Sequence, residues 1–316
     1  MPNHRTRLAP SPTGALHLGN ARTFLVTWAL ARQRGWQIVM RMEDLDGPRI
    51  KAGAAEESLD LLRWLGLDWD EGPYFQLADL AHYETAIAKL AAQGDIYFCT
   101  CTRKQIEAAS LSAPHGDEHE LRYPGTCQPA KRVPLSPVDL TRTEAALRVR
   151  VPDGQVEFLD QFAGRQQFDI QNTIGDFLVR TKENLPSYQM AVVVDDAHQQ
   201  IDQVIRGDDL LSSTPRQMLL YNKLGLQPLP MYTHLPLVVG SDGRRLAKRH
   251  GDSRLSHYRE QGVPAERIIG LLAEWCGVGS RSEMSAQVFL TRFQIASMSH
   301  KKAVFTYRDA TWLLGR

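Results

Sequence analysis

The sequence lacks the features that would place it in a membrane or in a strongly charged class of protein. It has no run approaching the roughly 18 unbroken apolar residues of a membrane-spanning helix, and no apolar segment follows its first five residues. Its 37 Lys and Arg are balanced by 36 Asp and Glu, so a nucleic acid partner would have to meet a local basic face. We therefore expect a cytoplasmic protein with no membrane partner.

Cysteine is also scarce, and its placement is uneven. Three of the four cysteines, Cys99, Cys101 and Cys127, fall in one short segment, and Cys276 lies far away in an apolar stretch. In a reducing compartment this spacing favours a metal site over disulfides, with unligated thiols as the alternative. The 316 residues are 43% hydrophobic, which is enough for one large or two medium domains with a sizeable core.

Strand-like and helical segments alternate over the first hundred residues, which predicts a parallel sheet covered by helices. From Cys99 to about Pro137 the chain is rich in Pro, Gly, His and Cys without periodicity, which predicts an inserted subdomain. Later apolar runs predict that the sheet resumes. Expected strands are 5–9, 36–41, 147–151, 190–194, 201–206 and 235–239, and expected helices are 21–34, 56–65, 84–93, 214–225 and 264–275.

This pattern divides the chain into four parts. Residues 1–98 are the first half of a nucleotide-binding catalytic domain, and 99–137 are a metal-binding insertion. Residues 138–251 are the second half of the catalytic domain, and 252–316 are a small helical region. The expected class is α/β, with a doubly wound parallel sheet and the ligand at the carboxyl ends of its strands.

The segment from Arg7 to Asn20 joins the first strand to the first helix. A Pro- and Gly-containing turn that leads into a helix N-terminus can receive a nucleotide phosphate. The same pattern is common in plain turns, so the spacing alone leaves both readings open.

Two motifs carry a family resemblance. Ser11-Pro12-Thr13-Gly14 with His17-Leu18-Gly19-Asn20 resembles the HIGH region of glutamyl-tRNA synthetases, which are class I aminoacyl-tRNA synthetases with a Rossmann-type fold. Arg245-Leu246-Ala247-Lys248-Arg249-His250-Gly251 is similar to the KMSKS-type loop of that family, although Arg245 and Ala247 stand where Lys and Ser are usual.

The resemblance implies that ATP is bound by His17, Gly19, Asn20 and Lys248, and that Mg²⁺ accompanies it. Attack of a carboxylate on the α-phosphorus of ATP builds negative charge, which imidazole and ammonium groups stabilise. His17 and Lys248 are the expected catalytic residues. Taken singly, His17 could instead be packed in a turn, and the basic residues of the loop could be a solvated surface.

The resemblance also implies a pocket for L-glutamate. An arginine fork matches a carboxylate, which favours glutamate over glutamine, and Glu43 is expected to hold the ammonium. Simpler readings are a helix-capping acidic cluster around Glu43, a surface ion pair at Arg206 and a core tyrosine at Tyr188. The residues implied for this pocket are Arg7, Ala9, Ser11, Glu43, Tyr188 and Arg206.

Three clustered cysteines in such a chain suggest one structural, tetrahedral Zn²⁺ with a fourth ligand. By chemistry alone, His115 and His119 are the obvious candidates. The resemblance favours Tyr123 instead, because a similar Cys-x-Cys and Tyr-x₃-Cys pattern occurs in truncated relatives. The expected ligands are Cys99, Cys101, Tyr123 and Cys127.

The resemblance implies that residues 252–316 form a helical stem-contact-like region, and we expect no anticodon-binding domain. The chain thus resembles a truncated branch of the family, which activates glutamate without tRNA and attaches it to the queuosine base in the anticodon of tRNA(Asp). Alternatives are a minimal glutamyl-tRNA synthetase that charges the 3′ end of tRNA(Glu), a non-catalytic RNA-binding protein, and another nucleotidyltransferase. We expect a monomer.

Overall fold

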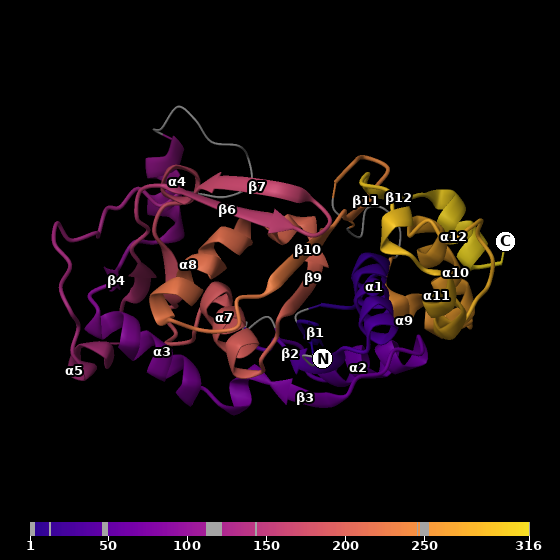
Figure 1. Ribbon diagram of the computed structural model, residues 1–316, viewed down its shortest axis with the longest axis horizontal. Helices are drawn as coiled ribbons and strands as arrows, with labels where there is room; N and C mark the ends of the chain where they lie inside the picture. The colour runs from indigo at the N-terminus through magenta and orange to yellow at the C-terminus, as the bar shows by residue number, and fades with distance from the viewer. Residues whose placement is uncertain are drawn as a thin grey trace.

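The computed structural model describes residues 4–12, 14–45, 50–111, 122–142, 144–244, 246 and 253–315. Within these ranges, no helix has both the length and the apolar character needed to cross a membrane. The molecule is elongated, with the thiol-containing part at one end, a parallel sheet in the middle and C-terminal helices at the other end (Figure 1). The predicted α/β class with a parallel sheet is confirmed.

The central sheet consists of two groups of parallel strands. In the first group β1 (Arg5–Leu8) pairs with β2 (Gln37–Met42), which pairs with β3 (Glu71–Phe75). In the second, β9 (Gln203–Gly207) pairs with β10 (Met231–Leu235). The groups meet where the amide of Asp202 donates to the carbonyl of Arg5 at 3.1 Å. The carboxyl ends of β1, β2 and β9 therefore face one region.

Helix α1 (Leu18–Arg34) follows β1 and is buried along most of its length. Its C-terminus is set by Gly35, whose φ of 65° lies in the left-handed region that favours glycine. Together with α2 (Ala54–Trp64) it covers the first strands. A 3₁₀ turn at Gln76–Ala78 and helix α3 (Ala81–Ala92) follow β3.

An antiparallel region interrupts the parallel sheet. Strand β5 (Ala146–Val149) pairs with β4 (Ile96–Cys99) and β8 (Phe177–Arg180), and β6 (Gln155–Asp160) forms a long hairpin with β7 (Gly164–Asp169). The short helices of this region are α4 (Arg103–Leu111), α5 (Pro137–Leu140) and α6 (Ile170–Thr173). In Figure 1 the hairpin lies above α8 (Thr214–Leu224).

The C-terminal part packs against α1. Strand β11 (Val238–Gly240) pairs in parallel with β12 (Ala303–Phe305), and one apolar core runs continuously from Leu8 to Leu313. Its remaining elements are α9 (Leu255–Glu260), α10 (Ala265–Trp275), α11 (Ala286–Arg292), a 3₁₀ turn at Ile295–Ser297 and α12 (Tyr307–Leu313).

One expected strand is wrong. Residues 190–194 belong to helix α7 (Tyr188–His198), which starts with Ser187 as its N-cap and is buried from Gln189 to Ala197. Because nearly every side of this helix is buried, its sequence has no polar face and reads as a continuous apolar run. The expected strand at 235–239 is divided, since β10 ends at Leu235 and β11 begins at Val238.

Candidate active site

His17 caps the N-terminus of α1. Its Nδ1 accepts the backbone N–H groups of Gly19 (3.1 Å) and Asn20 (3.3 Å), and the Asn20 side chain accepts the backbone N–H of His17 at 3.4 Å. An Nδ1 that accepts two hydrogen bonds is unprotonated, so a neutral ring carries its proton on Nε2. The ring can then donate from Nε2 while its other nitrogen caps the helix.

Gly19 is required beside this ring. A Cβ at Gly19 would lie 3.0 Å from Cε1 and 3.1 Å from Nδ1 of His17, which is closer than carbon atoms normally approach. The predicted ATP-binding residues His17, Gly19 and Asn20 thus lie together at a helix N-terminus, where backbone N–H groups and the helix dipole favour an anion.

The segment after the predicted KMSKS-like loop is attached to the same helix start. Leu18 donates its amide to the carbonyl of Ser253 at 2.9 Å, and Leu255 donates to the carbonyl of Leu16 at 2.9 Å. Lys248 itself lies outside the described residues, as do Arg245, Ala247, Arg249 and His250.

The side chains predicted to hold glutamate converge at the carboxyl ends of the strands. Burial raises the pKa of Tyr188 to about 12, with a further rise from Glu43 and opposing effects of Arg206 and Arg7. The Tyr188 side chain is 40% exposed, and the charges of Glu43, Arg206 and Arg7 all act on its hydroxyl. Arg7 and Arg206 are each only 5% exposed, which excludes the reading of Arg206 as a surface ion pair.

Residues 9–11 pass directly beside Glu43. The amide of Glu43 donates to the carbonyl of Pro10 at 3.0 Å, and the Ser11 hydroxyl donates to the carbonyl of Glu43 at 3.1 Å. Ala9 precedes this contact and is half-buried. Glu43 does not cap a helix, since α2 begins only at Ala54, with Gly53 as its N-cap. The carboxylate is therefore available to the pocket.

Glu43 belongs to a buried ionic network that was not predicted from the sequence. The Arg41 guanidinium donates to Asp196 at 2.7 Å and lies 3.7 Å from both Glu43 and Asp195. Arg7 lies 3.4 Å from the same Asp196 carboxylate. Burial raises the pKa of Glu43, while Arg41 and Arg7 oppose this shift.

This network contains three carboxylates and two guanidinium groups. Arg41 is 1% exposed, and Asp195 and Asp196 are 4% and 2% exposed, so screening by water is weak. His82 adds a third basic group to the network, since its Nε2 lies 3.0 Å from Asp195, and its hydrogen bond to that carboxylate raises its pKa. The only sequence signal for the network was an acidic pair directly after an apolar run.

Three thiols form a second cluster, with two at the end of β4 and just after it and the third in the segment beyond α4. The sulfur atoms of Cys99, Cys101 and Cys127 lie within 4.8 Å of one another. The Tyr123 hydroxyl lies 3.4 Å from the Cys99 sulfur and 3.8 Å from the Cys101 sulfur. Tetrahedral Zn–S bonds of about 2.3 Å place sulfur atoms about 3.8 Å apart, so this donor set fits such an ion.

The surroundings of the cluster favour the thiolate form of Cys127. Burial alone would raise the pKa of Cys127, but hydrogen bonds involving Tyr123, the Thr100 backbone and Cys101 lower it to about 7. The Arg148 Nε donates to the Cys99 sulfur at 3.3 Å, and its guanidinium lies 3.8 Å from the centre of the Tyr123 ring. The cluster can hold a metal ion, and His115 and His119 lie outside the described residues.

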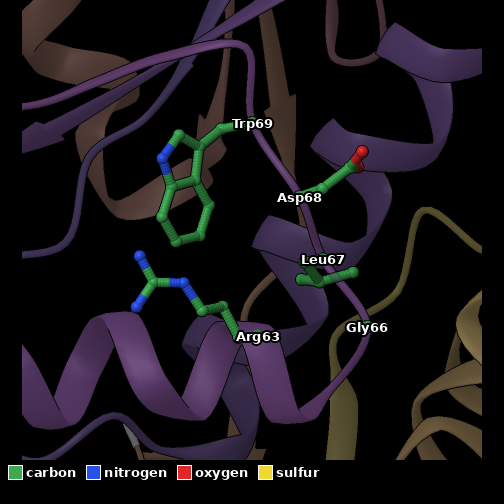
Figure 2. Close-up of a pocket in the computed structure, with 5 residues that line it drawn as sticks. All are labelled: Arg63, Gly66, Leu67, Asp68 and Trp69. Atoms are coloured by element: carbon green, nitrogen blue, oxygen red, sulfur yellow. The ribbon is translucent and has the colours of Figure 1, made fainter.

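Two cavities lie apart from the predicted ATP and glutamate residues. One of about 390 Å³ borders Cys99, Cys101 and Tyr123. The other, of about 450 Å³, is shown in Figure 2, where the Arg63 guanidinium faces the Trp69 ring, 4.8 Å from its centre. Asp68 at its edge accepts from Trp28 and Arg32. The charged side chains of this cavity are thus already paired within the protein, which indicates that they have a structural role.

Comparison with known proteins agrees with this geometry. The family model of the class I tRNA synthetase catalytic domain (E and Q) matches residues 3–312. The chain is 45% identical to the glutamyl-Q tRNA(Asp) synthetase of Symbiobacterium thermophilum, over 88% of both chains. It is 37% identical to the glutamate–tRNA ligase of Heliobacterium modesticaldum, over its full length and 65% of that relative.

A solved structure extends the agreement to the fold. The glutamate–tRNA ligase of Elizabethkingia meningosepticum, solved in complex with its amino acid, superposes with a TM-score of 0.80 at 26% identity, over 98% of this chain and 68% of that one. The chain therefore belongs to the class I tRNA synthetases of the glutamate and glutamine type and, among them, to the glutamyl-Q tRNA(Asp) synthetase family.

Proposed function

We propose that this protein activates L-glutamate with ATP, without requiring RNA for that step, and transfers the glutamate to the queuosine base in the anticodon of tRNA(Asp). The observation that carries this proposal is that the predicted glutamate residues are grouped at the carboxyl ends of the strands: Arg7 reaches the Ile205 carbonyl beside Arg206 and shares Asp196 with Arg41, which lies 3.7 Å from Glu43. The family membership and the 45% identity to a glutamyl-Q tRNA(Asp) synthetase support the transfer step.

The charges of the pocket suit glutamate. Arg206 is buried and would face the side-chain carboxylate, while Glu43 would accept the α-ammonium. Glutamine would leave the buried guanidinium without an anion, and an unpaired buried charge is costly. This difference predicts selection of glutamate over glutamine.

Adenylate formation joins a carboxylate oxygen of glutamate to the α-phosphorus of ATP and breaks the bond to pyrophosphate. The Nε2–H of His17 and the ammonium of Lys248 would donate to oxygens on which negative charge develops. The positive end of the α1 dipole would attract a phosphate at Gly19 and Asn20, whose own amides donate to Nδ1 of His17. Mg²⁺ would neutralise the leaving pyrophosphate.

We further propose that the thiol cluster binds one structural Zn²⁺ through Cys99, Cys101, Tyr123 and Cys127. Four protein ligands leave no open position for a substrate, so the ion would order the inserted segment. The segment then forms one wall of the adjacent cavity, which Arg103, Arg148 and Lys182 also line. We also propose that the chain acts as a monomer.

The test combines two assays of the purified full chain. Pyrophosphate exchange with glutamate in the absence of RNA measures activation. Transfer of labelled glutamate is then compared between tRNA(Asp) with and without queuosine and tRNA(Glu). We expect exchange without RNA, and label only on queuosine-containing tRNA(Asp).

Other outcomes would identify the alternatives. Label at the 3′ end of tRNA(Glu) would make this a minimal glutamyl-tRNA synthetase. Absence of both exchange and transfer, in a chain that still binds tRNA, would favour a non-catalytic RNA-binding protein.

A further inference from the structure

Arg206 is a buried cation whose partners are all neutral. Its Nε donates to Nε2 of His234 at 2.9 Å, and Nη1 donates to the Gln217 side chain at 2.9 Å. Nη2 donates to the Thr214 hydroxyl at 2.8 Å and to the Leu210 carbonyl at 3.4 Å. Among the described residues, no carboxylate forms an ion pair with this guanidinium, so its charge is left for a ligand.

The hydrogen-bond inventory of the guanidinium shows how it is held. Arginine has five N–H groups, and these contacts use the one on Nε, one on Nη1 and both on Nη2. Among the residues that the structure describes, no acceptor is recorded for the second Nη1–H, which can therefore donate to a ligand. The direction of this N–H depends on the hydrogen bonds that Nε, Nη1 and Nη2 already make.

His234 can accept from Arg206 in only one protonation state. Its Nδ1 lies 2.6 Å from Oδ2 of Asp160, and both side chains are fully buried. A carboxylate at that distance keeps the ring proton on Nδ1, which leaves a lone pair on Nε2 facing the Arg206 Nε–H. Burial lowers the pKa of His234 against the opposing effect of the Asp160 hydrogen bond, and the Arg206 charge lowers it further, which favours the neutral ring.

Asp160 is itself fixed by the β6–β7 hairpin. Its Oδ1 accepts the backbone N–H groups of Phe162 (3.0 Å), Ala163 (2.7 Å) and His234 (3.1 Å). One carboxylate oxygen therefore holds the hairpin turn and the other holds the histidine. The hairpin, which carries none of the predicted site residues, is thereby connected to the glutamate pocket.

We propose that Asp160 and His234 are positioning residues, which hold the Arg206 guanidinium in the orientation that receives the side-chain carboxylate of the substrate. This inference rests on the proposed function, since it assumes that Arg206 binds glutamate. Asp160 and His234 act through Arg206 and do not touch the substrate.

Asp160→Asn tests the hydrogen-bonded chain from Asp160 through His234 to Arg206 with almost no change in side-chain volume. The Asn side-chain oxygen can still accept from the hairpin backbone, but its NH₂ group would replace the oxygen that faces Nδ1. The ring would then place its proton on Nε2, so that two N–H donors face each other between His234 and Arg206. We expect the KM for glutamate to rise about tenfold or more, the preference for glutamate over glutamine to fall, and the KM for ATP to stay within about twofold.

Asp169→Asn is the matched control. Asp169 lies at the other end of the same hairpin and caps α6 by accepting the amide of Asn172 at 3.0 Å, a role that Asn also fulfils. This variant should keep the wild-type KM for glutamate. An Asp160→Asn variant that folds and also keeps that KM would overturn the proposal.

The tautomer of His234 can be measured without any variant. Nitrogen-15 NMR of the histidine-labelled wild-type chain should show a neutral His234 ring with its proton on Nδ1. A His234 ring that is cationic at neutral pH, or that carries its proton on Nε2, would overturn the proposal even if Asp160→Asn does not fold. A wild-type chain with no glutamate-dependent exchange would instead contradict the proposed function, so the two failures are distinguishable.

Discussion

At the start of α1, one imidazole ring serves two purposes through its two nitrogens. Nδ1 of His17 caps the helix, and Nε2 carries the proton that we assign to catalysis. Asparagine is a good N-cap residue, and its side-chain oxygen can take the place of Nδ1, but it has no group at the position of Nε2. Substitutions at this residue can therefore separate capping from catalysis.

We predict that His17→Asn lowers pyrophosphate exchange by roughly 2–4 kcal/mol of barrier with little change in melting temperature. His17→Ala should lower exchange similarly and also cost about 1 kcal/mol of stability through loss of the cap. Exchange kinetics and thermal unfolding of both variants check this. If His17→Asn exchanged pyrophosphate at the wild-type rate, His17 would have no role in adenylate formation.

Glu43 is predicted to favour substrate binding at the expense of stability. Burial raises the pKa of its carboxyl above the ordinary 4.5, so the ionised form is disfavoured in the folded chain. Glu43→Gln should weaken glutamate binding by roughly 10- to 100-fold, because a charge-assisted contact to the ammonium is lost. The same variant should melt at a higher temperature than the wild type at pH 7.

The pH dependence gives the sign of this effect. The penalty from the ionised carboxylate is present above the raised folded pKa and disappears as the pH falls through it toward 4.5. The difference in melting temperature between Glu43→Gln and wild type should shrink on acidification when both are followed from pH 7 to pH 4. A wild-type chain that is more stable than Glu43→Gln throughout would contradict this assignment.

At the scale of elements, the segments that follow β4 and α4 should depend on the proposed metal ion. Cys127→Ser removes one thiolate, and we expect zinc content to fall from one ion per chain and affinity to drop at least about tenfold. Hydrogen exchange should increase around residues 96–127, while β1 and β2 stay protected. Cys276→Ser is the control, because Cys276 is fully buried away from the cluster and its loss should leave zinc content unchanged.

Helix α7 shows why some elements could not be predicted. The run Met-Ala-Val-Val-Val at 190–194 is apolar and β-branched, which favours a strand when it is read alone. The helix is set by its surroundings, since it packs against α3 and α8 on buried faces. Ser187, whose side chain accepts the amide of Met190, was the local signal for a helix start. By contrast α8, with Pro215 in its first turn and Gly225 at its end, was correctly predicted from its caps.

On the scale of the whole molecule, the C-terminal helices and the nucleotide-binding half share one core. Phe289 is fully buried and stacks on Phe293 with 4.9 Å between ring centres, and the side chain of Gln33 in α1 donates to the carbonyls of Leu290 and Phe293 at 2.8 Å each. The C-terminal region is therefore part of the structure that supports α1.

We predict that Phe289→Ala costs about 3–5 kcal/mol in the free energy of unfolding and lowers the melting temperature of the nucleotide-binding half. Tyr307→Ala, at a residue that is 87% exposed, should change stability by less than about 0.5 kcal/mol. Chemical denaturation of both variants, followed by tryptophan fluorescence, measures the difference. Equal stability of the two would show that the C-terminal helices unfold independently of the core.

Motifs located the candidate site, but the groups that support it depend on tertiary structure. The family motifs pointed to Arg7, Glu43, Tyr188 and Arg206, which the structure brings together. Arg41, Asp160 and His234 were not predicted as site residues, and the role of each is recognisable only from burial and from partners distant in sequence. The role of a buried charged residue can be inferred once its neighbours in the fold are known.

Backbone hydrogen bonds hold the residues on both sides of the segment that carries Lys248. Before it, Gly240 donates to the carbonyl of Arg244 at 2.8 Å, and after it Ser253 and Leu255 are bonded to Leu18 and Leu16. Because closing a loop costs only about 0.6 kcal/mol more for each doubling of its length, the hydrogen bonds of Ser253 and Leu255 to the start of α1 should contribute more to stability than the length of the chain before them. The capped start of α1 therefore couples the folding of two segments that are far apart in the sequence.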